Sequence, residues 1–301
     1  MSESLAAPTP LALALFEAMR PRQWVKNVFV LAGVLFAGRL FDRGALLRSF
    51  AAFALFCAAA SAVYLVNDVA DREQDAQHPT KRMRPVASGR LSPGAALVAA
   101  MSLGAVALAG AAILSGPLLA FLAGYLALTY AYSFGLKRVF IVDALVVAAG
   151  FVVRAAAGAA VIDALISPWL ILCTFQLALF LSLGKRRHEL VLLGEEAPAH
   201  RDALSRYSVP LLDSWLTALS GATIVAYALY TQAPRTVEHF GTTHLIYTVP
   251  FVVFALFRYQ HLLVQGGKGG DPGSVLLRDP GLILAVLAWA AIAGLIIYAG
   301  R

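Results

Sequence analysis

The sequence predicts an all-α protein, a bundle of nine helices that each cross a membrane. Sixty per cent of its 301 residues are hydrophobic and only 14% are charged, whereas a soluble domain carries about 25% charged residues. Nine apolar stretches reach the roughly 20 residues that a helix needs to cross the hydrocarbon core, where an open backbone finds no hydrogen-bond partner. This composition excludes a water-soluble enzyme, a disordered chain and a protein that binds nucleic acid through a basic surface.

No repeat or long linker divides the chain, so we expect residues 1–301 to form a single transmembrane domain. Residues 1–20 contain Glu3 and no base before Arg20, which is not typical of a secretory signal. We expect this segment to lie at the membrane interface, with a short helix near residues 11–19. The nine predicted spans cover about residues 24–41, 45–66, 94–114, 117–135, 139–161, 167–184, 210–230, 243–263 and 280–299.

The positive charges predict how the bundle is oriented. Eighteen of the 24 Lys and Arg residues fall in the N-terminal segment and in the loops after the second, fourth, sixth and eighth spans, and five fall in the alternate loops. Basic loops stay on the cytoplasmic side of a membrane. We therefore expect the N-terminus and these loops in the cytoplasm and the C-terminus outside. The net charge of +7 also suits anionic ligands.

Acidic residues gather where the second predicted span ends. The segment reads Asn67-Asp68-Val-Ala-Asp71-Arg-Glu-Gln-Asp75, and a continuing helix would place its four numbered residues on one face. Carboxylates on one face repel each other without a cation, and Mg²⁺ typically takes one or two carboxylates together with phosphate oxygens. A solvated acidic helix end is the alternative, but acids near a helix C-terminus oppose its dipole. We favour a metal site.

A stiff basic loop follows the acids at once. Lys81, Arg82 and Arg84 lie within four residues, between two prolines. Arginine forks bind phosphate oxygens, so bases beside an acidic metal site predict a polyphosphate ligand. Membrane topology alone would also explain the bases, although not the order of acids followed by bases.

Further polar residues on the same side lie near the start of the first predicted span and in the loops after the fourth and sixth spans. The loops expected to carry the active site cover about residues 67–93, 130–140 and 184–209. Lys185 and Glu189 are four residues apart, and taken alone they are best interpreted as an intrahelical ion pair. Lys26 either reaches lipid phosphate or points inward. The candidates in these segments are Lys26, Asn27, Tyr130, Tyr132, Lys137, Lys185, Arg186 and Glu189.

Three residues inside the predicted spans are polar or polarisable. Arg154 would cost about 2.5–3.5 kcal/mol near the bilayer centre, so it is expected to face the bundle interior. We favour a structural role for it, with Asp143 or Asp163 as its partner. Cys57 and Cys173 lie in apolar runs and are expected to be small buried side chains.

The motifs together resemble the UbiA superfamily of intramembrane prenyltransferases. The resemblance lies in Arg-Pro-Arg-Gln-Trp-Val-Lys-Asn at residues 20–27, in the Asn-Asp-x-x-Asp-x-x-x-Asp motif at 67–75 and in Tyr-Ser-Phe-Gly-Leu-Lys-Arg at 132–138. Residues 62–68, 78–85 and 184–190 are similar to one branch, whose members transfer phosphoribosyl groups. Typical members carry a second acidic motif after the sixth span. Here residues 185–189 hold one acid and three strong bases, so we expect a site with more phosphate and fewer metals.

The resemblance implies an enzyme of the bacterial plasma membrane whose active site faces the cytoplasm. It would transfer 5-phosphoribosyl from phosphoribosyl pyrophosphate to polyprenyl (decaprenyl) phosphate, a precursor step for the arabinan of the cell wall. Its partners would be these two substrates and membrane lipids, with no nucleic acid, and a homo-oligomer stays open. Catalytic roles would fall to Asp71, Asp75 and Lys185, and Mg²⁺ would be held by Asn67, Asp68, Asp71 and Asp75. Substrate would be bound by Lys26, Asn27, Lys81, Arg82, Arg84, Tyr130, Tyr132, Lys137, Arg186 and Glu189.

Three other functions stay open from the sequence. A conventional member of the superfamily would transfer a prenyl group from its diphosphate to an aromatic or tetrapyrrole acceptor, but the bases at residues 185–187 disfavour it. A transporter would be expected to bind its substrate near the midplane, whereas the polar residues here gather at one face. A scaffold would give no reason for the acids followed by bases.

Overall fold

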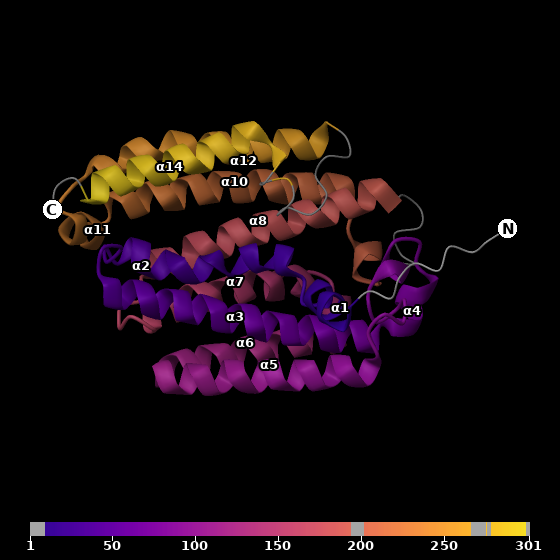
Figure 1. Cartoon of the computed structure of the whole chain (residues 1–301). Coiled ribbons are helices and arrows are strands. Elements are labelled where there is room, and N and C mark those ends of the chain that lie inside the picture. The colour runs from indigo at the N-terminus through magenta and orange to yellow at the C-terminus, as the bar shows by residue number, and fades with distance from the viewer. Residues whose placement is uncertain (1–9, 194–201, 266–274, 276–277, 299–301) are drawn as a thin grey trace.

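The computed structural model describes residues 10–193, 202–265, 275 and 278–298. Within these ranges the chain is all helical, and eight helices are long and apolar enough to cross a membrane. They run side by side, and successive ones alternate in direction (Figure 1). The eight are α3 (Arg43–Ala70), α5 (Pro93–Leu114), α6 (Gly116–Phe134), α7 (Val142–Ala160), α8 (Pro168–Leu193), α10 (Val209–Gln232), η6 (His244–Thr248) continuing into α12 (Val249–Val264), and α14 (Pro280–Tyr298).

The first predicted span, residues 24–41, is wrong as a single α-helix. It forms the 3₁₀ helix η1 (Pro21–Leu31) and the short helix α2 (Ala32–Phe36). A 3₁₀ helix rises about 2.0 Å per residue, so η1 and α2 together still cover about 30 Å, the thickness of the hydrocarbon core. Figure 1 shows α1 (Leu11–Ala18) and α2 at opposite ends of the bundle. The segment therefore crosses the bundle, in a tighter helix than the sequence predicted.

Close backbone contact fixes this first crossing against α7. A Cβ atom on Gly158 would overlap the carbonyl group of Val30, and one on Gly33 would overlap the backbone of Gly158. Glycine at both positions thus allows the two segments to touch main chain to main chain. This tertiary contact accompanies the 3₁₀ form of η1, which the local sequence does not predict.

Apolar side chains form two main clusters, one in each half of the chain. The first unites α2, α3, α6 and α7 around Phe56 and Tyr125. The second unites α8, α10, α12 and α14 around Phe180 and Tyr259. Helices α7 and α8 pack against each other and join the halves.

Arg154 is buried, as expected, but its predicted partners are wrong. Its guanidinium donates to Asn27 Oδ1 at 2.8 Å, to the Tyr125 hydroxyl at 2.9 Å and to the Gly150 carbonyl at 3.0 Å. The two acids proposed as partners pair elsewhere, Asp143 with Arg186 and Asp163 with Arg48. The contacts of Arg154 tie η1 to α6 and α7, which is consistent with a structural role.

The two cysteines differ. Cys57 is buried, as predicted, and accepts a hydrogen bond from Asn27 Nδ2 at 3.3 Å. Cys173 is only partly buried.

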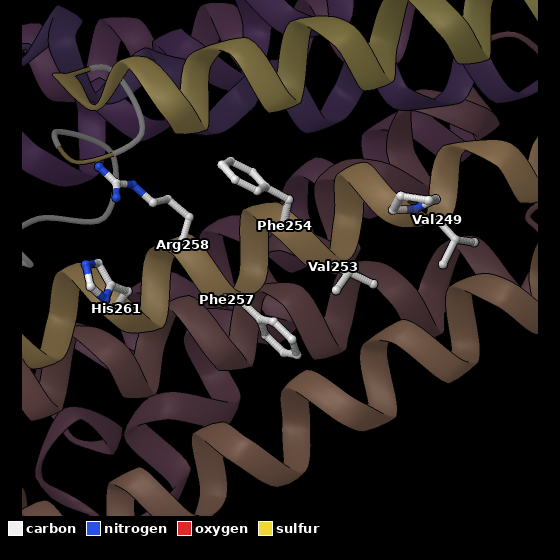
Figure 2. A pocket seen from close by; sticks show the side chains of 7 residues that line it. Val249, Val253, Phe254, Phe257, Arg258 and His261 are labelled. Carbon is white, nitrogen blue, oxygen red and sulfur yellow. The ribbon is translucent and has the colours of Figure 1, made fainter.

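A groove of about 820 Å³ runs along the outer face of α12 (Figure 2). Its walls are apolar, and Figure 2 shows Phe254 and Arg258 on one side of the helix and Val253 and Phe257 on the other. Arg258 is bonded to Asp279 at 2.9 and 3.2 Å. Such a surface suits contact with lipid hydrocarbon, and Arg258 and His261 are the polar residues in its lining.

Candidate active site

The three polar loops predicted to face the same side do meet at one end of the bundle. In Figure 1 this end carries α1 and α4 (Arg72–Gln77). Lys137 of the second loop lies 3.9 Å from Asp71 of the first, and Arg186 of the third reaches the hydroxyl of Tyr132 in the second at 3.3 Å. From the sequence, these segments were expected on one side of the membrane only because of the predicted topology. The structure shows that their side chains contact one another.

The acidic segment keeps nearly continuous helical hydrogen bonding from α3 into α4. The Asp71 N–H donates to the Asn67 carbonyl and the Asp75 N–H donates to the Asp71 carbonyl, both at 2.8 Å. Asp68 and Asp75 therefore lie on one inward face and are only 1% and 3% exposed. Asp71 sits at the junction with its side chain 38% exposed, beside Lys137.

Two arginines neutralise the buried acids. Arg20, just before η1, bonds Asp68 and lies 4.9 Å above the Tyr64 ring. Arg84 bonds Asp75 at 2.5 Å and Asp68 at 3.5 Å. Buried carboxylates need such partners, because an unpaired buried charge is costly. Arg20 holds a left-handed backbone with φ of 55°, a strained conformation typical of functional sites.

The expected metal ligands are present, but they do not form a ready-made cluster. In the described part of the chain, no three His, Cys, Asp or Glu side chains come together as a set that could hold a metal ion. Asp68 Oδ2 is nevertheless buried without a hydrogen-bond partner among the described residues. Together with the partly exposed Asp71, it offers the one or two carboxylates that Mg²⁺ uses beside substrate phosphates. The donor chemistry of the site thus fits Mg²⁺.

The basic loop folds back against the N-terminal helix. Arg90 donates to Glu17 of α1 at 2.7 and 3.0 Å and to the Met83 carbonyl at 2.5 Å. This leaves Lys81 and Arg82, in the 3₁₀ turn η2 (Lys81–Met83), exposed to solvent, whereas Arg84 reaches inward to the acids. The three bases predicted as one group therefore divide into two exposed charges and one half-buried arginine that is paired with the acids.

The bases after the sixth span also divide. Arg187 is bonded to Asp213 of α10 at 2.5 Å and to the Leu263 carbonyl at 2.7 Å. Arg186 is buried and bonded to Asp143 at 2.6 Å and to Glu189 at 3.1 Å. Lys185 keeps a side chain that is 41% exposed, with Nζ 4.0 Å from Glu189. The predicted ion pair between Lys185 and Glu189 thus exists as one part of a larger network.

Tyr207 completes this network from the segment between α8 and α10. Its hydroxyl donates to Asp143 Oδ1 at 2.8 Å and accepts the Ile141 N–H at 3.1 Å. Burial, followed by the hydrogen bond to Asp143, raises the pKa of Tyr207, so its phenol keeps the proton that it donates. The ring packs on Phe140 with centroids 4.7 Å apart.

Two predicted site residues, Asn27 and Tyr130, make contacts other than these. Asn27 is 1% exposed and bonds Arg154 and Cys57 deep in the bundle, and the structure does not bring it to the acids. Lys26 is half-buried on η1. Tyr130 is half-buried and stacks on Phe134 with centroids 6.4 Å apart.

Sequence reasoning missed three residues of the network. Arg20 belongs to the segment that carries the family resemblance, and that membership was its available signal. Asp143 was assigned to Arg154, because both lie in one predicted span. Tyr207 gave no signal, since its contacts cross 64 and 66 sequence positions.

The fold is that of a multi-pass membrane protein, and charged side chains from three segments gather at one end of its bundle. The chain matches the UbiA prenyltransferase family over residues 27–188. It is 39% identical over 300 residues to the decaprenyl-phosphate phosphoribosyltransferase of Mycobacterium tuberculosis, with 98% of each chain covered. The protein of the same name from Corynebacterium glutamicum is 38% identical, with 94% of this chain and 86% of that protein covered.

A solved structure shows the same fold. The UbiA homolog from Archaeoglobus fulgidus bound to GPP and Mg²⁺ superposes with a TM-score of 0.70 at 18% identity, covering 94% of this chain and 99% of that one. The chain belongs to the UbiA prenyltransferase family.

Proposed function

We propose that this chain transfers the 5-phosphoribosyl group of phosphoribosyl pyrophosphate to a polyprenyl phosphate, decaprenyl phosphate in the relatives named above. The observation that carries the proposal is the full-length similarity to enzymes of that name. The site supports it, because the last turns of α8 carry bases at residues 185–187, where a second acidic motif would serve a second metal. Phosphoribosyl pyrophosphate carries one phosphate more than a prenyl diphosphate, and surplus bases suit it.

In this reaction a phosphate oxygen of the lipid bonds to the anomeric carbon of the ribose. The bond from that carbon to the pyrophosphate breaks, and pyrophosphate leaves with the electron pair. A phosphate monoester is already ionised near neutral pH, so the protein needs no strong general base. Its task is to orient two anionic substrates and to balance their charge.

The residues of the site divide this task. Asp68 Oδ2 and Asp71 would hold Mg²⁺, with Asn67 and Asp75 completing the expected set. When bound, the metal would neutralise the leaving pyrophosphate. Arg84, which bonds Asp75 and Asp68, would turn toward substrate phosphate. Phosphate would also be bound by the exposed bases Lys81 and Arg82 and by the partly exposed Lys137 and Lys185.

We place this site at the cytoplasmic face of a bacterial plasma membrane. The excess of basic residues on the loops at this end supports that orientation. The sugar phosphate would then arrive from water, while the polyprenyl tail stays among the helices. Arg186 of α8 bonds Asp143 of α7, so both halves of the chain contribute residues to this end of the bundle, which supports one functional unit across the chain. The product would feed synthesis of cell-wall arabinan, and assembly into a homo-oligomer stays a prediction.

The test is a reconstitution with purified protein, Mg²⁺, labelled phosphoribosyl pyrophosphate and decaprenyl phosphate. We expect the label to move to a lipid-extractable product. The second candidate, prenyl transfer to an aromatic acceptor, is favoured by the family and by the fold. Prenylation of an aromatic acid from a prenyl diphosphate, with no lipid-linked phosphoribose, would replace our proposal with that activity.

A further inference from the structure

Asp143 lies at a junction between the two halves of the protein. It stands in the first turn of α7 and is 0% exposed. One carboxylate oxygen accepts the Arg186 Nε–H at 2.6 Å, and the other accepts the Tyr207 hydroxyl at 2.8 Å. Both oxygens are thus fixed by groups from other elements, as a buried carboxylate requires.

Arg186 is held in place on every side. It is 2% exposed, and beyond Asp143 its terminal nitrogens donate to Glu189 at 3.1 Å and to the Tyr132 hydroxyl at 3.3 Å. Its charge lies between two carboxylates. A guanidinium held in this way connects side chains to one another, so it is poorly placed to bind a substrate phosphate directly.

The outer end of this chain of contacts is Lys185. Glu189 uses Oε2 for Arg186 and places Oε1 4.0 Å from Lys185 Nζ. Of the three bases at 185–187, Lys185 has the most exposed side chain, at 41% against 3% for Arg186 and 9% for Arg187. These contacts connect Asp143, through Arg186 and Glu189, to the ammonium group of Lys185 at the partly exposed end of the network.

We propose that Asp143 is a positioning residue for the reaction, which acts through Arg186 and Glu189 to orient Lys185 and Tyr132 toward the pyrophosphate of the donor substrate. Tyr207 serves the same purpose by fixing the second oxygen of Asp143. The assignment to a donor rests on the proposed function, but the relay itself concerns any ligand that carries pyrophosphate. Arg186 then supports the side chains of the site, whereas the sequence suggested that it binds substrate phosphate directly.

A double-mutant cycle tests the relay. Asp143→Asn keeps the shape of the side chain and removes its charge, and Lys185→Ala removes the group at the far end. Binding of inorganic pyrophosphate with Mg²⁺ is measured by calorimetry on wild type, both single variants and the double variant in detergent. We expect each single change to weaken binding about ten-fold, and the double variant to bind within about two-fold of Lys185→Ala alone, because coupled residues are not additive.

Turnover is measured on the same four proteins. The KM for the phosphoribosyl donor is expected to rise in Asp143→Asn, while the KM for polyprenyl phosphate stays unchanged. A purely structural role would move both constants together. The relay would be overturned if the two single losses of affinity multiplied in the double variant. It would also be overturned if Asp143→Asn bound pyrophosphate as tightly as wild type, or if wild type bound no pyrophosphate.

A milder variant covers the case in which Asp143→Asn does not fold. Tyr207→Phe removes one hydroxyl from the same carboxylate, and we expect a loss of about three-fold that disappears in the Lys185→Ala background. Tyr227→Phe is the matched control, since its buried hydroxyl bonds Thr248 and Trp289 in the second half, away from the site. An equal loss in both tyrosine variants would contradict the relay. If the cycle shows coupled pyrophosphate binding but no lipid-linked phosphoribose is formed, only the proposed function is contradicted.

Discussion

Arg84 offers the sharpest test of how the acidic site is balanced. One guanidinium bonds two buried carboxylates, Asp75 at 2.5 Å and Asp68 at 3.5 Å, and its own side chain is 28% exposed. Arg84→Met keeps most of the apolar stem and removes the charge. Breaking a buried ion pair typically costs about 3–5 kcal/mol, and the partial exposure of Arg84 places the expected loss at the lower end, about 3 kcal/mol.

Mg²⁺ should return part of that stability. Without Arg84, the acids attract a divalent cation more strongly, and a ligand at 100 times its Kd stabilises a fold by about 2.7 kcal/mol. We expect millimolar Mg²⁺ to raise the thermal stability of Arg84→Met more than that of wild type, measured by unfolding in detergent. Arg90→Met is the control, because its pair with Glu17 is exposed and worth about 0–1 kcal/mol. Equal Mg²⁺ shifts in wild type and Arg84→Met would refute this account of the acids.

Three further predictions concern the metal and the first crossing. Asp71→Ala is expected to abolish transfer of labelled phosphoribose while the protein still elutes as a folded species in detergent, and near-normal turnover would remove Asp71 from the metal site. Chelation of Mg²⁺ is expected to stop turnover reversibly, and activity that persists in excess chelator would contradict a metal requirement. Gly158→Ala is expected to lower the free energy of unfolding by about 1–3 kcal/mol through overpacking against Val30. Gly124→Ala, with open space around its Cβ, should change it by less than about 0.5 kcal/mol, and equal effects would contradict the close contact.

Much of the fold follows from the sequence, because apolar length alone identifies a membrane helix. The exception is the first span. Its helical form goes with the contact between Gly33, Gly158 and Val30, and residues 30 and 158 are far apart in the chain. No local pattern could predict this pairing, so the segment was expected to be an ordinary α-helix.

The site was predictable where its residues are neighbours in sequence. Asp68 and Asp75 lie seven residues apart on one helical track, so spacing alone placed them on one face. The partners of buried charges were not predictable, since Arg20 and Asp68 are separated by 48 positions, and Arg186 and Asp143 by 43. Charge counting shows that such acids need bases, but only the packing of helices decides which base meets which acid.

The same limit explains the changed interpretation of Arg186. From the sequence it was one of three consecutive bases, of which Lys185 and Arg186 were both expected to bind phosphate. Packing of α8 against α7 buries Arg186 against Asp143, whereas Lys185, one residue earlier, points to a more open surface. Adjacent positions on a helix face different directions, so equal charges acquire unequal roles.

The most direct measurement of the proposed function is the mass of the lipid product. Decaprenyl phosphate is incubated with the purified protein, Mg²⁺ and both possible donors, phosphoribosyl pyrophosphate and a prenyl diphosphate, together with an aromatic acid. We predict that the lipid gains one phosphoribosyl group and that one pyrophosphate is released for each product molecule, while the aromatic acid stays unmodified. An unchanged lipid beside a prenylated aromatic acid would contradict the account.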